Sequence, residues 1–289
     1  MGGRHDDVAE SLSHAQSALS PVAVIDVMAP AWCRPLLSRM PEVNEAIPMP
    51  LGHGALEIGA RRKLGHSLRE RRYDRAYVLP NSFKSALVPF FAAIPHRTGW
   101  RGEMRYGLLN DARVLDKPRP LMVERYVALA YDKGVMRSAK ICRNRCCGRS
   151  CRSTTVRSRK CARSSIFPLN AQSLVFAPAQ NLAKRWPHYH YAELAKQLID
   201  EGYQVVLFGS AKDHEAGNEI LAALSMEQQA WCRNLAGETQ LEQAVVLIAA
   251  CKAVVSNDSG LMHVAAALNR PLVALYGPSS PDYSAVAAR

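Results

Sequence analysis

The fold class is decided by one stretch of the chain, AVVSNDSGLMHVAAAL, which spans residues 253–268. The stretch begins with an apolar run, passes through a polar turn that contains Gly260, and continues with apolar residues typical of a helix. A strand that leads through a short turn into a helix is the repeating unit of a parallel α/β sheet. The sequence therefore predicts a strand at 253–255 and a helix at 261–268.

The same alternation continues on both sides of this stretch. In the C-terminal half, the pattern predicts strands at 173–176, 204–208 and 272–276, and helices near 191–199, 214–224 and 241–248. In the N-terminal half, it predicts strands at 24–28 and 76–79, and helices at 32–40, 55–72 and 82–93, the last capped by Asn81 or Ser82. The chain is thus expected to be an α/β protein of two doubly wound, Rossmann-like halves, with a ligand site in the cleft at the strands' carboxyl ends.

Charge and cysteine content set one segment apart from the rest of the 289 residues. The net charge of +12 would suggest a polyanionic partner, but ten of the 37 basic residues lie between Arg137 and Arg163, where no acidic residue occurs. The same stretch holds five of the eight cysteines, which are Cys142, Cys146, Cys147, Cys151 and Cys161. It contains no Cys-x-x-Cys pair, and only Phe167 lies nearby to stack on a base, so a solvated linker is favoured over a zinc or nucleic-acid module.

The sequence contains no feature of a membrane or secreted protein. Its longest apolar run, 244–251, is far shorter than the roughly 20 residues that a spanning helix needs. Residues 1–20 carry Asp6, Asp7 and Glu10 and have no apolar core of a signal peptide. We therefore expect a cytoplasmic protein.

The turn at 256–263 is the first candidate ligand site. The amides of a helix N-terminus attract phosphate, and Gly260 lets a ligand approach the backbone closely. Asp258 is then placed to bind ribose hydroxyls, and His263 lies one turn into the helix. An ordinary helix start is the alternative, in which Asp258 or Ser259 caps the helix and His263 packs in the core.

Basic residues supply two further candidates. Lys184 lies between a predicted strand and a predicted helix, where its charge would stabilise a departing phosphate. Arg97, Arg101 and Arg105 lie in a segment, 96–105, that is interpreted as a loop, and arginine binds phosphate or carboxylate at two points. Solvated surface charges are the alternative in both places.

Taken together, these motifs resemble the ADP-heptose:lipopolysaccharide heptosyltransferases of glycosyltransferase family 9, and within it the heptosyltransferase II branch. The matching segments are IDVMAPAW (25–32), LPNSFKSAL (79–87), RTGWRGE (97–103), AKRWP (183–187), NDSGLMH (257–263) and YGP (276–278). The resemblance covers about 25–137 and 183–282. It implies a GT-B fold, with an acceptor-side domain at 24–137 and a nucleotide-sugar-binding domain at 173–289, joined by the linker 138–172.

The resemblance also implies a reaction and a set of contacts. The reaction is an inverting, metal-independent and cofactor-independent transfer of heptose from ADP-heptose to the heptose of the lipid-anchored lipopolysaccharide inner core. Membrane contact would be peripheral, at the inner face of the inner membrane, with no role for nucleic acid. Donor contacts are implied for Lys184 at the diphosphate, Glu215 at the nucleoside, and Asp258, Ser259, Gly260 and His263. Acceptor contacts are implied for Lys84, Arg97, Arg101 and Arg105.

The chain departs from the family pattern at the catalytic loop. In the family, the base is an aspartate in a Val-Gly-Asp-Met-Met-Met-Ser loop after the first strand, and this chain has neither that strand nor that loop. Asp6 and Asp7 lie near its place but are not its counterpart. No catalytic residue is therefore assigned, and the N-terminal domain is expected to be incomplete. A C-terminal helix typical of the family is also missing, so 173–289 is expected to be truncated.

A change of reading frame would account for these departures. The family loop, written as GTG GGC GAC ATG ATG ATG TCG and read from its third base, encodes Gly3-Arg4-His5-Asp6-Asp7-Val8. The family's Gly-Ala-Glu-Phe-Gly, written as GGC GCA GAA TTT GGC and read one base later, gives Ala179-Gln180-Asn181-Leu182. We hypothesise that 1–23, 138–182 and 284–289 are out-of-frame translation of a heptosyltransferase gene.

Three functions stay open on the sequence alone. The first is a heptosyltransferase, an enzyme whose transfer step is weakened by the missing loop. The second is a catalytically inactive member of the family that binds ADP or another nucleotide through 183–282. The third is a basic nucleic-acid or metal-binding protein built on 137–163, which salt-sensitive binding or stoichiometric zinc would support.

Overall fold

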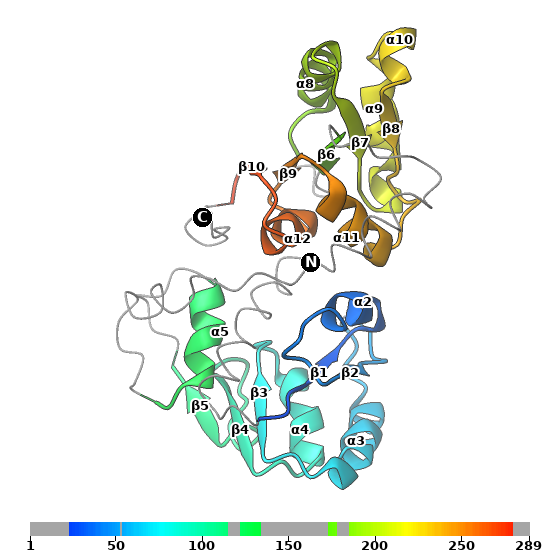
Figure 1. Cartoon of the computed structure of the whole chain (residues 1–289). Coiled ribbons are helices and arrows are strands. Elements are labelled where there is room, and N and C mark those ends of the chain that lie inside the picture. The colour runs from blue at the N-terminus through cyan, green and yellow to red at the C-terminus, as the bar shows by residue number, and fades with distance from the viewer. Residues whose placement is uncertain (1–22, 53, 115–121, 134–172, 178–184, 280–289) are drawn as a thin grey trace. The chain divides into compact units, whose positions relative to one another are not determined.

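A computed structural model describes residues 23–52, 54–114, 122–133, 173–177 and 185–279. The linker 138–172, Lys184, residues 1–22 and residues 280–289 lie outside the described residues. The described residues divide into two compact units, one within 10–34 and 42–148 and the other within 35–41 and 149–289. Each unit is described by itself (Figure 1).

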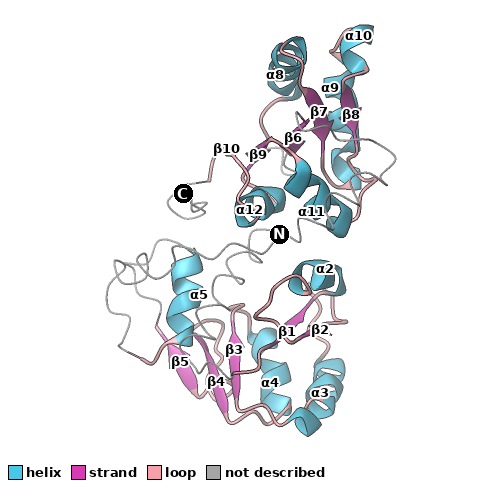
Figure 2. Ribbon diagram, in the orientation of Figure 1, coloured by secondary structure: helices cyan, strands magenta, loops and turns pink. Residues whose placement is uncertain are grey.

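The C-terminal unit contains one five-stranded parallel sheet (Figure 2). Its strands are β6 (Ser173–Ala177), β7 (Gln204–Leu207), β8 (Cys232–Asn234), β9 (Ala253–Asn257) and β10 (Leu272–Leu275), in the order β10-β9-β6-β7-β8. Its helices are α8 (His188–Asp200), η5 (Ala211–Asp213), α9 (His214–Ala222), α10 (Met226–Gln229), α11 (Leu241–Ala250) and α12 (Gly260–Ala267). This is the doubly wound order, in which the first strand of the unit lies in the middle and the chain leaves it in both directions.

Strand β6 holds this sheet together. All five of its residues are buried, and Val175 is paired with Val206 of β7 on one side and with Val254 of β9 on the other. A parallel strand that is covered on both faces is expected to be a continuous apolar run. The last four residues of β6, LVFA, meet that requirement, and the buried hydroxyl of Ser173 donates a hydrogen bond to Gln204. The strand forms although it lies within 138–182, the segment that the frame hypothesis assigns to out-of-frame translation.

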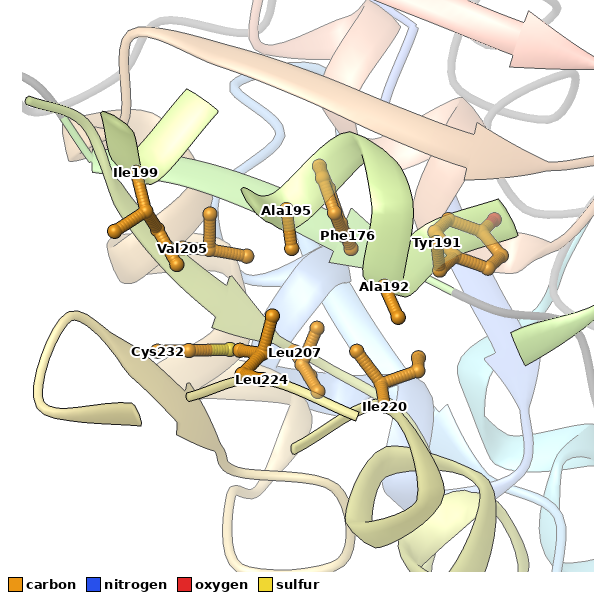
Figure 3. Packing of buried hydrophobic residues seen from close by; sticks show 10 residues of the cluster. All are labelled: Phe176, Tyr191, Ala192, Ala195, Ile199, Val205, Leu207, Ile220, Leu224 and Cys232. Atoms are coloured by element: carbon orange, nitrogen blue, oxygen red, sulfur yellow. The ribbon is translucent and has the colours of Figure 1, made fainter. Parts of the chain in front are cut away.

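The core of the C-terminal unit lies between the sheet and helices α8 and α9 (Figure 3). Its buried side chains are Phe176, Tyr191, Ala192, Ala195, Ile199, Val205, Leu207, Ile220, Leu224 and Cys232. Leu194 and Leu198 also pack against this cluster, so one face of α8 is apolar and covers the sheet. Gly202 follows α8 with a φ of 86°, a value that favours glycine, and its amide donates to the Ile199 carbonyl at 2.8 Å.

The N-terminal unit contains two separate parallel sheets among its described residues (Figure 1). Strands β1 (Asp26–Ala29) and β2 (Glu45–Pro48) form one, and β3 (Arg75–Val78), β4 (His96–Trp100) and β5 (Asp111–Arg113) form the other. Its helices are η2 (Ala31–Cys33), α3 (Ile58–Ser67), η3 (Arg69–Arg71), η4 (Phe83–Ala86), α4 (Leu87–Phe91) and α5 (Met122–Ala130). Helix α2 (Arg34–Leu37) follows η2 directly, but 35–41 is assigned to the other unit.

Two expectations for the N-terminal half were wrong in detail. The segment interpreted as a loop at 96–105 begins with strand β4, whose HRTGW sequence has no alternating apolar pattern. Ser82 occupies the N-cap position of η4, but its side chain makes no capping hydrogen bond there. The Glu103 carboxylate accepts the hydrogen bond of the Phe83 amide instead, at 2.7 Å, so a residue from a neighbouring loop satisfies the start of this helix.

None of the described helices combines the length and the hydrophobicity that crossing a bilayer requires.

Candidate functional site

The candidate site lies at the carboxyl edge of the five-stranded sheet. The chain leaves β6 towards β7 on one side, while β9 pairs with β6 on the other, so the topological switch point falls between β6 and β9. Ligands of doubly wound sheets bind in the crevice outside the strands at such a point. The segments that follow these strands are 178–187 and 258–263. They contain five of the six predicted donor residues.

The turn after β9 leaves the start of α12 without a cap from its own N-cap side chain. Ser259 is the N-cap residue, with φ −142° and ψ 172°, and its hydroxyl lies 3.2 Å from the Ser256 hydroxyl instead of capping the helix. The Asp258 amide donates to the Leu275 carbonyl at 3.2 Å, which ties the turn to β10. Asp258, Ser259 and Gly260 are all half-buried.

His263 lies on the first turn of α12 and is buried, with 6% of its surface exposed. This placement agrees with the alternative in which it packs in the core. Its contact with a ligand stays a prediction.

Hydrogen bonds and an ion pair hold the part of the segment after β6 that begins at Arg185. Trp186 donates its backbone N–H to the Asn257 Oδ1 at 3.3 Å, and the Tyr191 hydroxyl donates to the same oxygen at 2.8 Å. The Arg185 guanidinium is paired with the Asp213 carboxylate at 3.3 Å. Burial raises the pKa of the Tyr191 phenol well above its usual value, so this hydroxyl stays protonated and remains a donor. Lys184 itself lies outside the described residues.

Glu215 lines an open pocket of about 400 Å³ beside this segment. The lining residues are Arg185, Pro187, His188, Lys212, Glu215, Ala216 and Glu219. The turn that shapes the pocket depends on Gly209, because a Cβ atom there would lie 2.6 Å from the Cβ of Asp213. The pocket presents two cations and two carboxylates, a set suited to a polar ligand that carries both phosphate and hydroxyl groups.

The predicted acceptor residues separate into two groups by their place on the three-stranded sheet. Lys84, on η4, follows the carboxyl end of β3, and the exposed Arg101 follows the carboxyl end of β4. Arg97 lies near the amino end of β4, four residues and about 13 Å of strand away from Arg101. Arg97 also donates to the carbonyls of Ile94 at 2.5 Å and Leu108 at 2.6 Å, so the structure gives it a role within the sheet.

Arg105 is buried, with 2% of its surface exposed. Its guanidinium donates to the Pro80 carbonyl at 2.6 Å and also to the Trp100 carbonyl. Burial lowers the pKa of this guanidinium, because the charge is removed from water. The structure therefore places Arg105 as a clamp between the segments that follow β3 and β4, and this burial argues against a direct contact with an acceptor.

Among the described residues, no group of three or more His, Cys, Asp or Glu side chains is placed to hold a metal ion. Cys33, Cys232 and Cys251 have buried thiols, and burial raises the pKa of each to about 12, so none is a reactive thiolate at neutral pH. The five clustered cysteines of the basic segment lie outside the described residues.

Sequence reasoning missed the residues that hold this site in shape. Asn257 stands directly before Asp258 in the NDSGLMH motif. Nothing in the surrounding sequence distinguishes it from an ordinary turn residue. Tyr191 lies in the predicted helix near 191–199, but the sequence does not indicate a partner for its hydroxyl. The pairing of Arg185 with Asp213 joins residues 28 positions apart, which no local pattern reveals.

Comparison with known proteins identifies the family. Residues 61–288 match the model of a family described as Glycosyltransferase family 9 (heptosyltransferase). The chain is 75% identical over 281 residues to lipopolysaccharide heptosyltransferase 2 of Escherichia coli K12, an alignment that covers 96% of this chain and 80% of that protein. It is 55% identical over 269 residues to lipooligosaccharide heptosyltransferase 2 of Haemophilus influenzae, covering 91% of this chain and 77% of that protein.

Solved structures give the same result. The structure of Escherichia coli ADP-heptose lipopolysaccharide heptosyltransferase II matches with a TM-score of 0.89 and 67% identity, covering 98% of this chain and 84% of that one. Escherichia coli heptosyltransferase WaaC with ADP matches in fold, with a TM-score of 0.70 at 21% identity and coverage of 98% and 86%. Both the predicted family resemblance and the predicted GT-B fold are thereby confirmed. The chain belongs to glycosyltransferase family 9, a family of heptosyltransferase enzymes.

Proposed function

We propose that this chain takes heptose from ADP-heptose and transfers it to the heptose of the lipopolysaccharide inner core. The observation that carries the proposal is the position of Asp258, Ser259 and Gly260, which lie at the topological switch point of an unbroken doubly wound sheet. The relatives of high identity are named for lipopolysaccharide heptosyltransferase activity, which supports the same substrate class.

The donor would bind to the C-terminal unit, which corresponds to the proposed donor domain at 173–289. The amides at the start of α12 would receive the diphosphate, and the helix N-terminus would stabilise the charge of departing ADP. Glu215 lines a pocket large enough for part of the nucleoside. Lys184 is assigned to the diphosphate, and His263 to the donor side, on the family pattern alone.

The acceptor would bind to the N-terminal unit, in the proposed domain 24–137. Lys84 and Arg101 lie at the carboxyl edge of their sheet, where their charges suit an anionic saccharide. Arg105 acts in this proposal as a positioning residue, and Arg97 supports the opposite edge. The acceptor is lipid-anchored, so we place the enzyme in the cytoplasm with peripheral contact at the inner face of the inner membrane. Neither nucleic acid, metal nor another cofactor is required.

A second function, nucleotide binding without transfer, is favoured by one observation. The sheet of the donor unit is continuous, whereas the described strands of the acceptor unit form two separate sheets. Because the family's aspartate loop is missing from the sequence, no residue of this chain is assigned as the base that would deprotonate the acceptor hydroxyl.

Two measurements on the same preparation of the full chain distinguish the two functions. Calorimetry measures ADP affinity, and mass spectrometry of a heptose-terminated lipopolysaccharide acceptor measures transfer from ADP-heptose. Asp258→Ala is expected to weaken ADP binding roughly tenfold or more, because a charged hydrogen-bonding group is lost. Glu201→Ala is the control, because Glu201 follows the far end of α8. ADP binding with transfer supports the enzyme, ADP binding alone selects the second function, and no ADP binding refutes both.

A further inference from the structure

Asn257 is a buried polar residue at the end of β9 to which no role in binding has been given. Only 2% of its surface is exposed. Its Oδ1 faces the Trp186 backbone N–H at 3.3 Å and the Tyr191 hydroxyl at 2.8 Å. A backbone N–H can only donate, so the atom that faces it must be the carbonyl oxygen of the side-chain amide, and the Tyr191 hydroxyl then donates to that oxygen as well.

Trp186 is held from several directions at this point. Besides its hydrogen bond to Asn257, its ring meets the Tyr191 ring edge-on, with the ring centres 5.0 Å apart. On another side its ring stacks on His190, with the centres 5.2 Å apart. The short segment at 185–187 is thereby fixed to the carboxyl end of β9, although it follows β6 in the sequence.

This attachment joins the two parts of the donor site. Arg185, the residue before Trp186, lines the pocket that contains Glu215, and its guanidinium is paired with Asp213. Asp258, the residue after Asn257, begins the turn into α12. Asn257 therefore precedes the turn at 258–260 directly in the chain, and its side chain accepts hydrogen bonds from Trp186, next to Arg185, and from Tyr191.

We propose that Asn257 is a positioning residue for the donor. It sets the place of Arg185 and its pocket relative to the turn at 258–260, so that one nucleoside diphosphate contacts both. The proposal rests on the donor site described under Proposed function. Tyr191 assists by supplying a buried donor to the same oxygen.

Calorimetric titration of the full chain with ADP tests this role without requiring transfer activity. Asn257→Ala removes the acceptor of both hydrogen bonds, and we expect it to weaken ADP binding roughly tenfold. Ser173→Ala is the matched control, because the Ser173 hydroxyl donates a buried hydrogen bond of 2.8 Å to Gln204 at the amino end of the same sheet. The control should lower the melting temperature to a similar extent and leave ADP affinity unchanged.

A double-mutant cycle with Arg185→Ala separates positioning from general loss of stability. If Asn257 acts through Arg185, then Asn257→Ala should weaken ADP binding by less than about twofold in the Arg185→Ala background. Fully additive effects, or equal losses in Asn257→Ala and Ser173→Ala, would overturn the proposal.

Tyr191→Phe keeps the ring packing and removes one donor, so a loss of about threefold is expected. If Asn257→Ala fails to fold, this variant serves in its place, and unchanged ADP affinity would then be the overturning result. A wild-type chain that does not bind ADP would refute the donor site itself, whereas a chain that binds ADP while the variants behave as the control would refute only the role of Asn257.

Discussion

The two units of this protein are built from the same alternation of strand and helix, but their sheets differ at the centre. In the C-terminal unit, β6 lies between β9 and β7 and joins both sides into one sheet. In the N-terminal unit, no described strand pairs with the side of β1 opposite β2 or with the side of β3 opposite β4. Among the described residues, the N-terminal unit therefore has no strand in the place that β6 occupies in the C-terminal unit.

The strand order of the N-terminal unit indicates what is absent from its described part. One further strand, placed between β1 and β3, would join the two sheets into a single sheet of six strands. If that strand came before β1 in the sequence, the sheet would have the doubly wound order. That position corresponds to residues before β1, a segment that the frame hypothesis assigns to out-of-frame translation. The frame hypothesis for 1–23 would account for two separate sheets among the described strands.

Restoring the first strand should give the largest effect on this comparison. We expect that replacing residues 1–23 with the family's in-frame strand and its Val-Gly-Asp-Met-Met-Met-Ser loop will raise the transfer rate by about 10²–10⁴, the usual contribution of a general base. The melting temperature should also rise, because the replacement would supply a strand to pair with β1 and β3. Steady-state transfer assays and thermal unfolding provide the measurements.

Two checks accompany this experiment. The same replacement with the loop aspartate changed to asparagine should recover stability without recovering transfer. Sequencing the encoding DNA across codons 1–25, 137–184 and 280 to the stop should show the family's Gly-Asp-Met-Met-Met and Pro-Gly-Ala-Glu-Phe-Gly in alternate frames. Frames that encode nothing recognisable would reject the hypothesis and make the cysteine-rich segment a genuine insertion.

The second prediction concerns how the N-terminal unit holds its carboxyl edge together. Arg105→Ala should lower the free energy of unfolding by about 2–3 kcal/mol, because it removes charged hydrogen bonds and leaves the Pro80 and Trp100 carbonyls without this donor. Arg101→Ala, a change on the exposed side of the same loop, should alter stability by less than about 0.5 kcal/mol and raise the KM for the acceptor. Urea unfolding and acceptor kinetics would show the contrast, and equal stability losses in both variants would contradict it.

The smallest predicted effect is a difference in acid sensitivity between the units. Burial raises the pKa of Asp111, but the hydrogen bonds and charge of Arg113 outweigh burial and hold it below its usual value. A carboxyl whose pKa is lowered by folding stabilises the protein above its unfolded pKa of about 3.9, and this contribution is lost as the pH falls through the folded value. The Asp111 side chain is 35% exposed, so the contribution is below about 1 kcal/mol.

Urea unfolding of the wild type and of Asp111→Asn between pH 6 and pH 3 measures this contribution. The wild type should lose more stability than the variant as the pH falls, and the loss should appear in probes of the N-terminal unit such as Trp100. Parallel pH profiles for the two proteins would exclude the effect.

Much of the C-terminal unit could be predicted from the sequence because its signals are local. A strand that is buried on both faces is expected to be mostly apolar, and a helix that covers a sheet must be apolar on one face, so the residues of β6, β7 and α8 predict these elements. The strand–turn–helix at 253–268 is likewise predicted by its own residues, because a turn that admits a ligand needs small and polar residues beside an apolar strand. Family membership follows from several such segments together.

Only the tertiary structure decided the features that depend on residues far apart in the chain. The four predicted acceptor residues are close together in the sequence, but their separation into Lys84 and Arg101 at one edge, Arg97 at the other and Arg105 in the interior depends on where β4 begins. HRTGW forms a strand because β3 and β5 pair with it on both sides, which its own composition does not indicate. Asn257 acquires its partners in the same way, because a hydrogen bond between β9 and the segment after β6 exists only once the strand order has brought them together.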